Sequence, residues 1–318
     1  RFFANFFSFF PVHPIFILWE ICYTEACISR RDRPGREGTI RSKRRAEHPR
    51  KEGRSMAQSM IAQAKRLVVK VGTSTLTYEN GRLNIRRIEA LVKVLSDIRN
   101  SGREVLLVSS GAIGVGAGHL GLKERPRDVE GKQAAAAVGQ CELMYTYDKL
   151  FAEYGYVTAQ VLLTRDVVEE DTRKKNAVNT LCRLLEYGAL PIINENDTVA
   201  VEEIEFGDND TLSAIVAELV GAQGLVLLTD IDGLYDADPH TNPAAKPIPV
   251  VHTIDEKLLS LAGGAGSSRG TGGMITKLHA AEIAMAAGIP TVIMDGSRPS
   301  RLYDLMDGAS LGTIFCAE

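Results

Sequence analysis

The sequence predicts an α/β fold, as one large domain or two lobes, built on a mostly parallel open sheet. Three observations support this class. The 318 residues are 45% hydrophobic, which is enough to bury a large core. Short, almost continuously apolar runs such as 66–71 are typical of strands that helices cover on both faces. Such runs alternate with helical patterns up to the C-terminus, as in right-handed strand–helix–strand units.

Within residues 61–318 the apolar patterns place the strands and helices in order. Helix 85–100 is the clearest, because its apolar side chains recur at the i, i+3, i+4, i+7 spacing of one helical stripe. Strands are expected at 66–71, 104–108, 156–164, 189–193, 225–228, 290–294 and 312–315. Helices are expected at 85–100, 133–154, 172–187, 211–220, from 275 onward and near Leu302. We expect a hairpin at 198–206 and a surface loop at the turn-rich segment 236–249.

Residues 1–60 differ in composition from the rest of the chain. They hold seven of the ten Phe residues, the only Trp, and 12 Lys/Arg against 6 Asp/Glu. Pro11 and Pro14 interrupt their apolar run, and Glu20 ends it before the ~20 residues that a membrane span requires. We therefore interpret residues 1–60 as a disordered, non-native extension, with a targeting segment as the alternative.

Charge and cysteine content narrow the class of partner and the compartment. Residues 61–318 carry 25 Lys/Arg against 34 Asp/Glu, so this part of the chain is acidic and gives no electrostatic case for nucleic acid. No apolar run in it reaches membrane length. The five cysteines show no C-x-x-C pair and no zinc spacing, which favours incidental thiols in a reducing compartment. The sequence therefore predicts a cytoplasmic protein.

Polar side chains follow the buried strands where open α/β sheets bind their ligands. Lys70 stands near the carboxyl end of the first strand, and we expect it to contact phosphate, with a structural salt bridge as the alternative. Ser110 and Gly111 follow the second strand, where small residues let backbone N–H groups approach an anion; tight helix packing is the alternative. The polar run 194–197 follows a later buried strand. Burying these side chains costs free energy unless they form hydrogen bonds or bind a ligand. We expect Asp197 to contact a ligand.

The segment Gly207–Asp210 places two carboxylates and an amide before the apolar helix 211–220. Asp208 can serve as the N-cap of that helix. Two acids and an Asn exceed what capping needs, so Asn209 or Asp210 is expected to face a ligand. Because hard cations prefer carboxylate and amide oxygens, a magnesium site is the first functional hypothesis.

A glycine-rich loop precedes the last long helix. Residues 263–273 contain six glycines, and their N–H groups can fold around phosphate oxygens. The loop leads into Met274, Ile275, Thr276 and Lys277, and it lacks Walker A spacing. Two further polar residues, Thr229 and Asp230, again stand at the carboxyl end of an expected strand.

The chemistry that these residues offer does not rely on histidine, since none of the four beyond residue 60 lies near the polar strand ends in sequence. What remains is two lysines beside glycine-containing loops, Lys70 and Lys277, together with acidic strand ends. This set suits phosphoryl transfer to an acceptor that needs no base. A carboxylate, with an unperturbed pKa of roughly 4, is such an acceptor, and positioning and charge compensation then supply the catalysis.

Six segments together resemble the glutamate 5-kinases of the amino-acid kinase family, in that family's order. They are KVGTS at 70–74, VSSGAI at 108–113, INEND at 193–197, GDND at 207–210, LTD at 228–230 and GTGGMITK at 270–277. The resemblance covers the chain from about Arg66 to the C-terminus. It implies a three-layer αβα sandwich around a mostly parallel open sheet, with an amino-acid-binding lobe at 61–222 and a nucleotide-binding lobe at 223–318.

The resemblance also implies an activity and a role for each motif. The activity is ATP-dependent phosphorylation of the L-glutamate side chain to L-glutamyl 5-phosphate, the first step of proline biosynthesis, with proline as inhibitor. Lys70, Lys277 and Asp210 take the catalytic roles, Asp210 by holding the two lysines in place. The implied substrate contacts are Ser110, Gly111, Asn194, Asp197 and Asn209. The implied ATP contacts are Lys70, Thr229, Asp230, Thr271, Gly272, Gly273, Met274, Ile275, Thr276 and Lys277.

These roles move Gly207–Asp210 away from a magnesium cage, because Mg²⁺ can be held by ATP oxygens and water with no metal site of the protein's own. The family also implies a homo-oligomer. Many bacterial relatives carry a C-terminal PUA domain, and plant and animal relatives a fused reductase. We expect neither here, so those longer proteins are no guide to assembly and regulation. Two alternatives stay open: a kinase for another amino acid, of the acetylglutamate or aspartate type, and a non-catalytic amino-acid sensor. Both lysines and Asp210 argue against the sensor.

Overall fold

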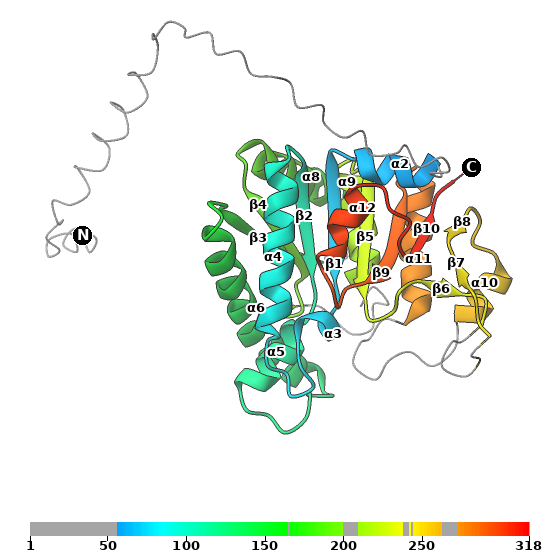
Figure 1. Ribbon diagram of the computed structural model, residues 1–318. Helices are drawn as coiled ribbons and strands as arrows, with labels where there is room; N and C mark the ends of the chain where they lie inside the picture. Colours follow the sequence, from blue (N-terminus) through cyan, green and yellow to red (C-terminus); the bar gives the residue numbers. More distant parts are fainter. Residues whose placement is uncertain are drawn as a thin grey trace, which may run out of the picture. The chain divides into compact units, whose positions relative to one another are not determined.

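The computed structural model describes residues 56–317 except 165, 200–208, 238–241, 243 and 263–272. Residues 1–55, Asp208 and most of the expected hairpin lie outside this described part. Eight strands form one sheet in the order β3-β4-β2-β1-β5-β9-β10-β8 (Figure 1). They are β1 Arg66–Val71, β2 Glu104–Ser109, β3 Thr158–Leu163, β4 Leu190–Glu195, β5 Gly224–Thr229, β8 Val250–Val251, β9 Thr291–Asp295 and β10 Thr313–Phe315. All pair in parallel except β9 with β10, which confirms the mostly parallel sheet.

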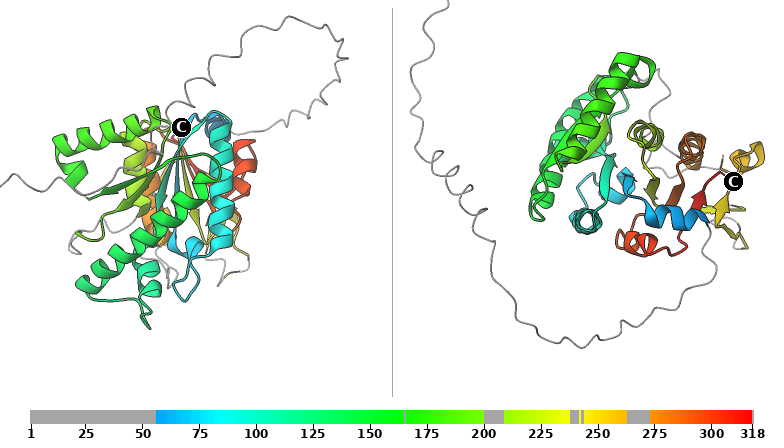
Figure 2. Two further views of the ribbon diagram at one scale, coloured as in Figure 1. Left: turned by 90° about the vertical axis from the view of Figure 1, so that its left-hand side faces the viewer. Right: turned by 90° about the horizontal axis from the view of Figure 1, so that it is seen from above.

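Helices cover both faces of the sheet, so the fold has the three layers that the sequence predicted (Figure 2). One layer contains α2 Met56–Gln63, α3 Thr73–Leu76, α4 Ile85–Asn100, α5 Ala112–His119, α6 Val129–Ala152 and α12 Arg301–Met306. The other contains α7 Asp166–Glu169, α8 Asp171–Glu186, α9 Asn209–Leu219, α10 Glu256–Ala262 and α11 Met274–Ala286. A separate pair of short strands, β6 Leu234–Tyr235 and β7 Pro247–Ile248, is antiparallel.

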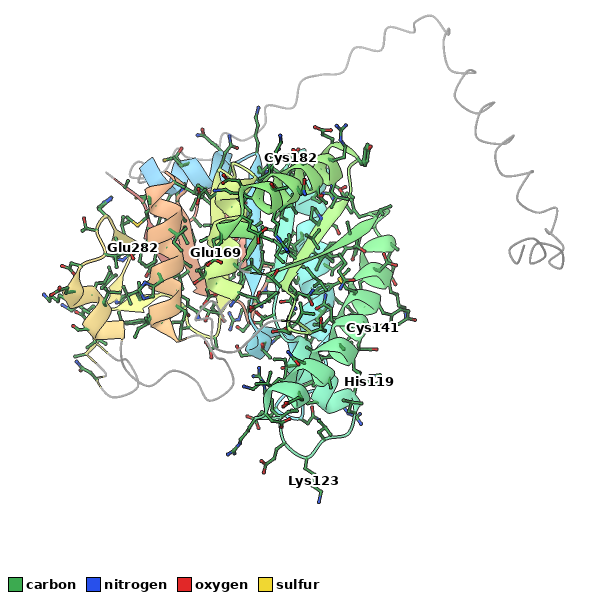
Figure 3. All side chains as sticks on the ribbon, turned by 180° about the vertical axis from the view of Figure 1, so that it is seen from behind. His119, Lys123, Cys141, Glu169, Cys182 and Glu282 are labelled. Carbon is green, nitrogen blue, oxygen red and sulfur yellow. The ribbon has the colours of Figure 1, made fainter. Side chains whose placement is uncertain are left out.

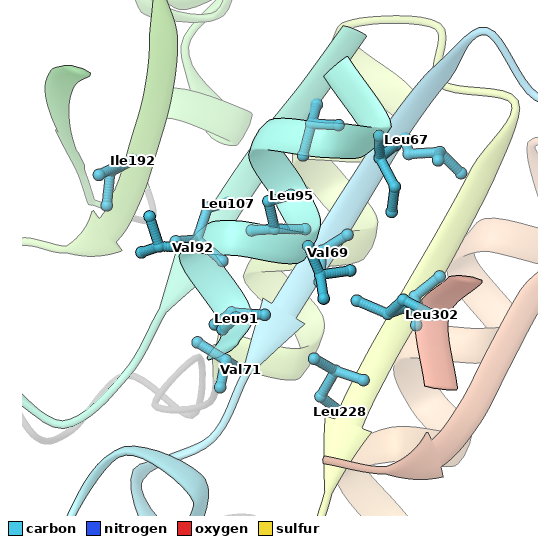
Figure 4. Packing of buried hydrophobic residues seen from close by; sticks show 14 of the residues in the cluster. Leu67, Val69, Val71, Leu91, Val92, Leu95, Leu107, Ile192, Leu228 and Leu302 are labelled. Carbon is cyan, nitrogen blue, oxygen red and sulfur yellow. The ribbon is translucent and has the colours of Figure 1, made fainter. Parts of the chain in front are cut away.

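Alternate side chains of the central strand β1 fill two separate cores. Val69 and Val71 pack with Leu91 and Leu95 of α4 on one face (Figure 4). Val68 belongs to the cluster on the opposite face, which includes residues of α8, α9 and α11. Burial of both faces explains why the strand has no polar alternation. It also makes β1 a rigid support for the residues at its carboxyl end.

Most element boundaries agree with the sequence, and the differences have local causes. Strand 66–71 and helix 85–100 have the predicted bounds. Helix α6 begins four residues early, because the Asp128 side chain accepts a hydrogen bond from the backbone N–H of Gly131 and caps it there. Helix α9 begins at Asn209, so Asn209 and Asp210 lie in its first turn and not in the loop before it. Part of the expected surface loop 236–249 is the strand β7, which pairs with β6.

Helix α2 crosses the compositional boundary at residue 60. It begins at Met56, and the side chains of Gln58 and Ile61 are buried. Residues 56–60 therefore belong to a helix packed on the sheet. Among the helices of the described residues, none is both long enough and apolar enough to cross a membrane.

Two glycines let α5 and α6 pack with their backbones in contact. A Cβ added at Gly116 would lie 1.8 Å from the carbonyl oxygen of Ala135, and one at Gly139 would lie 1.8 Å from that of Ala112. Real side chains cannot approach backbone that closely, so only glycine permits this helix pair. Because α5 follows directly on Ser110 and Gly111, the contact also fixes the loop after β2.

We expect Gly116→Ala to lower the free energy of unfolding by about 1–3 kcal/mol or more, because the added methyl group forces the two helices apart. Gly114→Ala in the same helix is the matched control. Its Cβ would meet only a methyl group of Thr73 at 3.6 Å, and alanine favours the helix by roughly 0.5–1 kcal/mol. Urea denaturation of both variants checks this. Equal stability of the two would contradict the close-packing account.

Candidate active site

The carboxyl ends of the central strands bring the predicted residues to one edge of the sheet. Parallel register sets Val71 opposite both Ser109 of β2 and Leu228 of β5. Strand β4 lies on the other side of β2 and ends in Asn194 and Glu195. The residues after four neighbouring strands therefore face a common region, as expected for ligand binding in an open α/β sheet.

Three charged side chains meet in the interior beside this edge. Nζ of Lys70 on β1 lies 2.5 Å from Oδ1 of Asp210, and Nζ of Lys277 on α11 lies 3.0 Å from Oδ2 of the same carboxylate. The three side chains are 6%, 8% and 0% exposed for Lys70, Lys277 and Asp210 respectively. The structure thus brings together all three residues predicted to be catalytic, and each comes from a different element.

The triad of Lys70, Asp210 and Lys277 has a net charge of +1, because two ammonium groups share one carboxylate. Burial alone would raise the pKa of Asp210, but the charges of the two lysines hold that pKa well below its usual range. The carboxylate is therefore ionised at neutral pH and orients both ammonium groups. A buried cluster with excess positive charge is costly unless an anion joins it. The geometry favours binding of an anionic group, such as a phosphate, near the lysines.

Two hydroxyl groups anchor Asp210 further. Oγ1 of Thr276 lies 3.2 Å from Oδ2 of Asp210 and 2.9 Å from the carbonyl oxygen of Gly273, so its one hydrogen is shared between these two acceptors. Ser213 donates to the backbone carbonyl of Asp210 at 2.6 Å. The sequence assigned Thr276 to the nucleotide, and its contact with Asp210 was not foreseen. Its position one residue before Lys277 explains the contact, since both face the start of α9.

A second group of side chains, all polar and uncharged, lies next to the triad. Nδ2 of Asn209 donates to Oγ of Ser110 and to Oδ1 of Asn194, both at 2.9 Å. Three residues that are far apart in sequence are therefore neighbours in space. Gly111 follows Ser110 with φ of 104°, a left-handed conformation that favours glycine, and α5 starts immediately after it. Sequence reasoning missed Gln140 of α6, whose side chain contacts Asn194.

Asp197 follows two residues after the end of β4. Burial raises the pKa of its carboxyl to about 6, and the positive charge of Arg125 lowers it in part. A carboxyl group whose pKa is raised toward neutral pH is typical of functional sites. Arg125 lies in the loop between α5 and α6 and was not singled out from the sequence, because no motif marks it.

The residues predicted to contact nucleotide are only partly described. Thr229 is buried at the end of β5, and its hydroxyl donates to Asp230 at 3.0 Å. Thr271 and Gly272 lie outside the described residues. Gly273 is in extended conformation and precedes α11, which begins with Met274 and Ile275. This helix start directs Lys277 inward while the side chain of Ile275 stays 40% exposed.

Comparison with known proteins bears on the same residues. The model of the amino acid kinase family matches residues 65–295, which include every candidate site residue. The chain belongs to the amino acid kinase family. The glutamate 5-kinase of Clostridium perfringens is 55% identical over 262 residues, covering 81% of this chain and 97% of that protein. Those of Listeria monocytogenes EGD-e and Symbiobacterium thermophilum are each 53% identical, covering 81% of this chain and 95% and 98% of theirs.

Solved structures extend the fold assignment. The isopentenyl phosphate kinase of T. acidophilum aligns with a TM-score of 0.56 at 20% identity, covering 79% of this chain and 99% of that one. The UMP kinase of Bacillus anthracis aligns with a TM-score of 0.56 at 17% identity, covering 80% and 97%. At 20% identity or less, these two structures support only the fold assignment. They agree with the α/β fold predicted from the sequence.

We expect Asp197→Asn to raise the free energy of unfolding by on the order of 2 kcal/mol at pH 7.5. The pKa of this carboxyl is raised from 3.8 in the unfolded chain to about 6, so its ionisation destabilises the fold as pH rises through that window. The gain should shrink by roughly half at pH 5, where the folded carboxyl is mostly protonated. Urea denaturation at both pH values checks this, with the exposed Asp304→Asn as control. A gain that did not depend on pH would contradict the raised pKa.

Proposed function

We propose that this protein transfers the γ-phosphoryl group of ATP to the side-chain carboxylate of L-glutamate, giving L-glutamyl 5-phosphate, the first step of proline biosynthesis. The observation that carries the proposal is the adjacency of two unlike sites on one helix turn. Asp210 holds the lysine pair, and the preceding residue, Asn209, joins Ser110 and Asn194. The family and the named activity of the relatives at 53–55% identity support it.

The proposed reaction needs no general base. The acceptor carboxylate is already ionised at neutral pH, and one of its oxygens attacks the γ-phosphorus while the bond to the ADP oxygen breaks. Negative charge spreads over the transferring group, and the ammonium groups of Lys70 and Lys277 compensate it from a site with little water. Asp210 stays ionised and keeps both ammonium groups in place, so no reorganisation is needed during the transfer.

The remaining roles rest on the motifs and on the arrangement of the described residues. Substrate binding falls to Ser110, Gly111, Asn194, Asp197 and Asn209. ATP binding falls to Lys70, Thr229, Asp230 and the segment 271–277. Among the described residues there is no group of three or more His, Cys, Asp or Glu side chains that could hold a metal ion. Mg²⁺ would then be bound mainly by ATP oxygens and water, and would neutralise charge on the phosphates.

Further properties follow from the resemblance and are part of the proposal. They are inhibition by proline, a homo-oligomeric state, a division into an amino-acid-binding part at 61–222 and a nucleotide-binding part at 223–318, and action in the cytoplasm. The three described cysteines, Cys141, Cys182 and Cys316, are free thiols, which suits a reducing compartment (Figure 3 labels the first two).

A substrate panel tests the proposal directly. ADP release, followed by a coupled assay, is measured with L-glutamate, L-aspartate or N-acetyl-L-glutamate as acceptor, each with and without proline. We expect glutamate-dependent turnover that exceeds that of the other two acceptors by at least tenfold in kcat/KM. Preference for another acceptor would assign a different kinase of the family. Proline binding by calorimetry without any turnover would instead indicate an amino-acid sensor.

A further inference from the structure

Gln140 of α6 is a buried amide that none of these roles uses. Its Oε1 accepts a hydrogen bond of 2.9 Å from Nδ2 of Asn194, which lies 54 residues away in sequence. Gln140 is 9% exposed and Asn194 is 1% exposed. We propose that Gln140 is a positioning residue that acts through Asn194 to orient the amide of Asn209, with the oxygen of that amide toward the ammonium group of the substrate.

The orientation of Asn194 follows from a donor whose identity is fixed. The backbone N–H of Glu195 donates to Oδ1 of Asn194 at 2.9 Å, and a backbone N–H can only donate. The oxygen of the Asn194 amide must therefore face Glu195. Its nitrogen then points to the other side, where the oxygen of Gln140 receives it. Without that oxygen, Nδ2 of Asn194 would be a buried donor with a lost partner, which is strongly unfavourable.

The orientation of Asn209 follows in turn from that of Asn194. Because Oδ1 of Asn194 is an acceptor, the group of Asn209 that faces it must be the nitrogen. The same nitrogen donates to Ser110, so both of its hydrogens are used. Oδ1 of Asn209 is buried, and it has no hydrogen-bond partner among the described residues. A buried acceptor in this state calls for a donor from a ligand.

The chemistry of the substrate decides which donor this is, and here the inference rests on the proposed function. Both carboxylates of glutamate are ionised at neutral pH and only accept hydrogen bonds. The α-ammonium group is therefore the only donor that the substrate offers. After loss of Gln140, the amide of Asn194 is free to turn, so that its oxygen no longer faces Asn209. The amide of Asn209 can then flip and present its N–H groups, not its oxygen, to the ammonium group. Recognition of the amine would then fail, while the carboxylates would still bind.

The test separates recognition of the amine from general disturbance of the site. The KM for glutamate is compared with the Ki of glutarate, which has both carboxylates but no ammonium group, as a competing ligand. In Gln140→Met we expect the KM for glutamate to rise about tenfold, as for loss of one hydrogen bond to a charged group. The Ki of glutarate and the KM for ATP should change less than twofold. Gln160→Met, at an exposed position of β3, is the matched control. It should leave the KM for glutamate, the Ki of glutarate and the KM for ATP unchanged.

Equal rises in the KM for glutamate and the Ki of glutarate would overturn the proposal, because they would indicate a merely structural role. If Gln140→Met does not fold, Gln140→Ala is measured in the same way, and its glutamate KM must rise at least threefold more than its glutarate Ki.

A double variant tests whether Gln140 acts through Asn209. In an Asn209→Ala background, adding Gln140→Met should change the glutamate KM less than twofold; a full tenfold rise there would overturn the proposal. Wild-type protein that turns over no glutamate would overturn the proposed function as well, whereas normal turnover with unchanged constants in Gln140→Met would overturn only the role of Gln140.

Discussion

The site depends on one constraint: a single buried carboxylate must hold two ammonium groups. Lys70 comes from the central strand and Lys277 from a helix on one face of the sheet, and Asp210 lies between them in the first turn of a neighbouring helix. Removing Asp210 would leave two buried ammonium groups with no counter-charge, which is strongly unfavourable. The rigid strand β1, packed on both faces, and the contact between α9 and α11 therefore serve to keep the three groups together.

Charge and hydrogen bonding are divided between adjacent residues of α9. Asp210 contacts the two lysines, whereas Asn209 joins the uncharged network of Ser110 and Asn194. In the proposed reaction, the first group compensates charge on the transferred phosphoryl group and the second binds glutamate. Helical geometry turns successive residues by about 100°, so one helix start can serve both regions without mixing them. This arrangement explains how a phosphoryl donor and an amino acid could meet at the end of a single sheet.

Apolar periodicity and strand-end polar residues are local signals, and they predicted the sheet class, the helices on both faces and the two lysines. The role of Asp210 in holding those lysines came only from the family resemblance. The family resemblance implied that Ser110, Asn194 and Asn209 contact one substrate, and the structure places these three side chains together. Local patterns could not reveal Gln140, since its role arises from a contact across 54 residues on a helix that reads as Ala-rich and unremarkable. The closeness of Gly116 and Gly139 to facing backbone was hidden for the same reason. Thr276 was given to nucleotide binding, and only the packing of α11 against α9 revealed its hydrogen bond to Asp210.

The most direct measurement of the central claim is steady-state kinetics of Asp210→Asn with glutamate and ATP. Because asparagine keeps the shape but not the charge that holds the two lysines, the account predicts that kcat falls by about 10²–10³-fold. The KM for glutamate should stay within about threefold of wild type, and the exposed Asp304→Asn serves as control. Circular dichroism is used to check that the variant is folded. A folded variant whose kcat stays within threefold of wild type would contradict the claim that Asp210 organises the catalytic lysines.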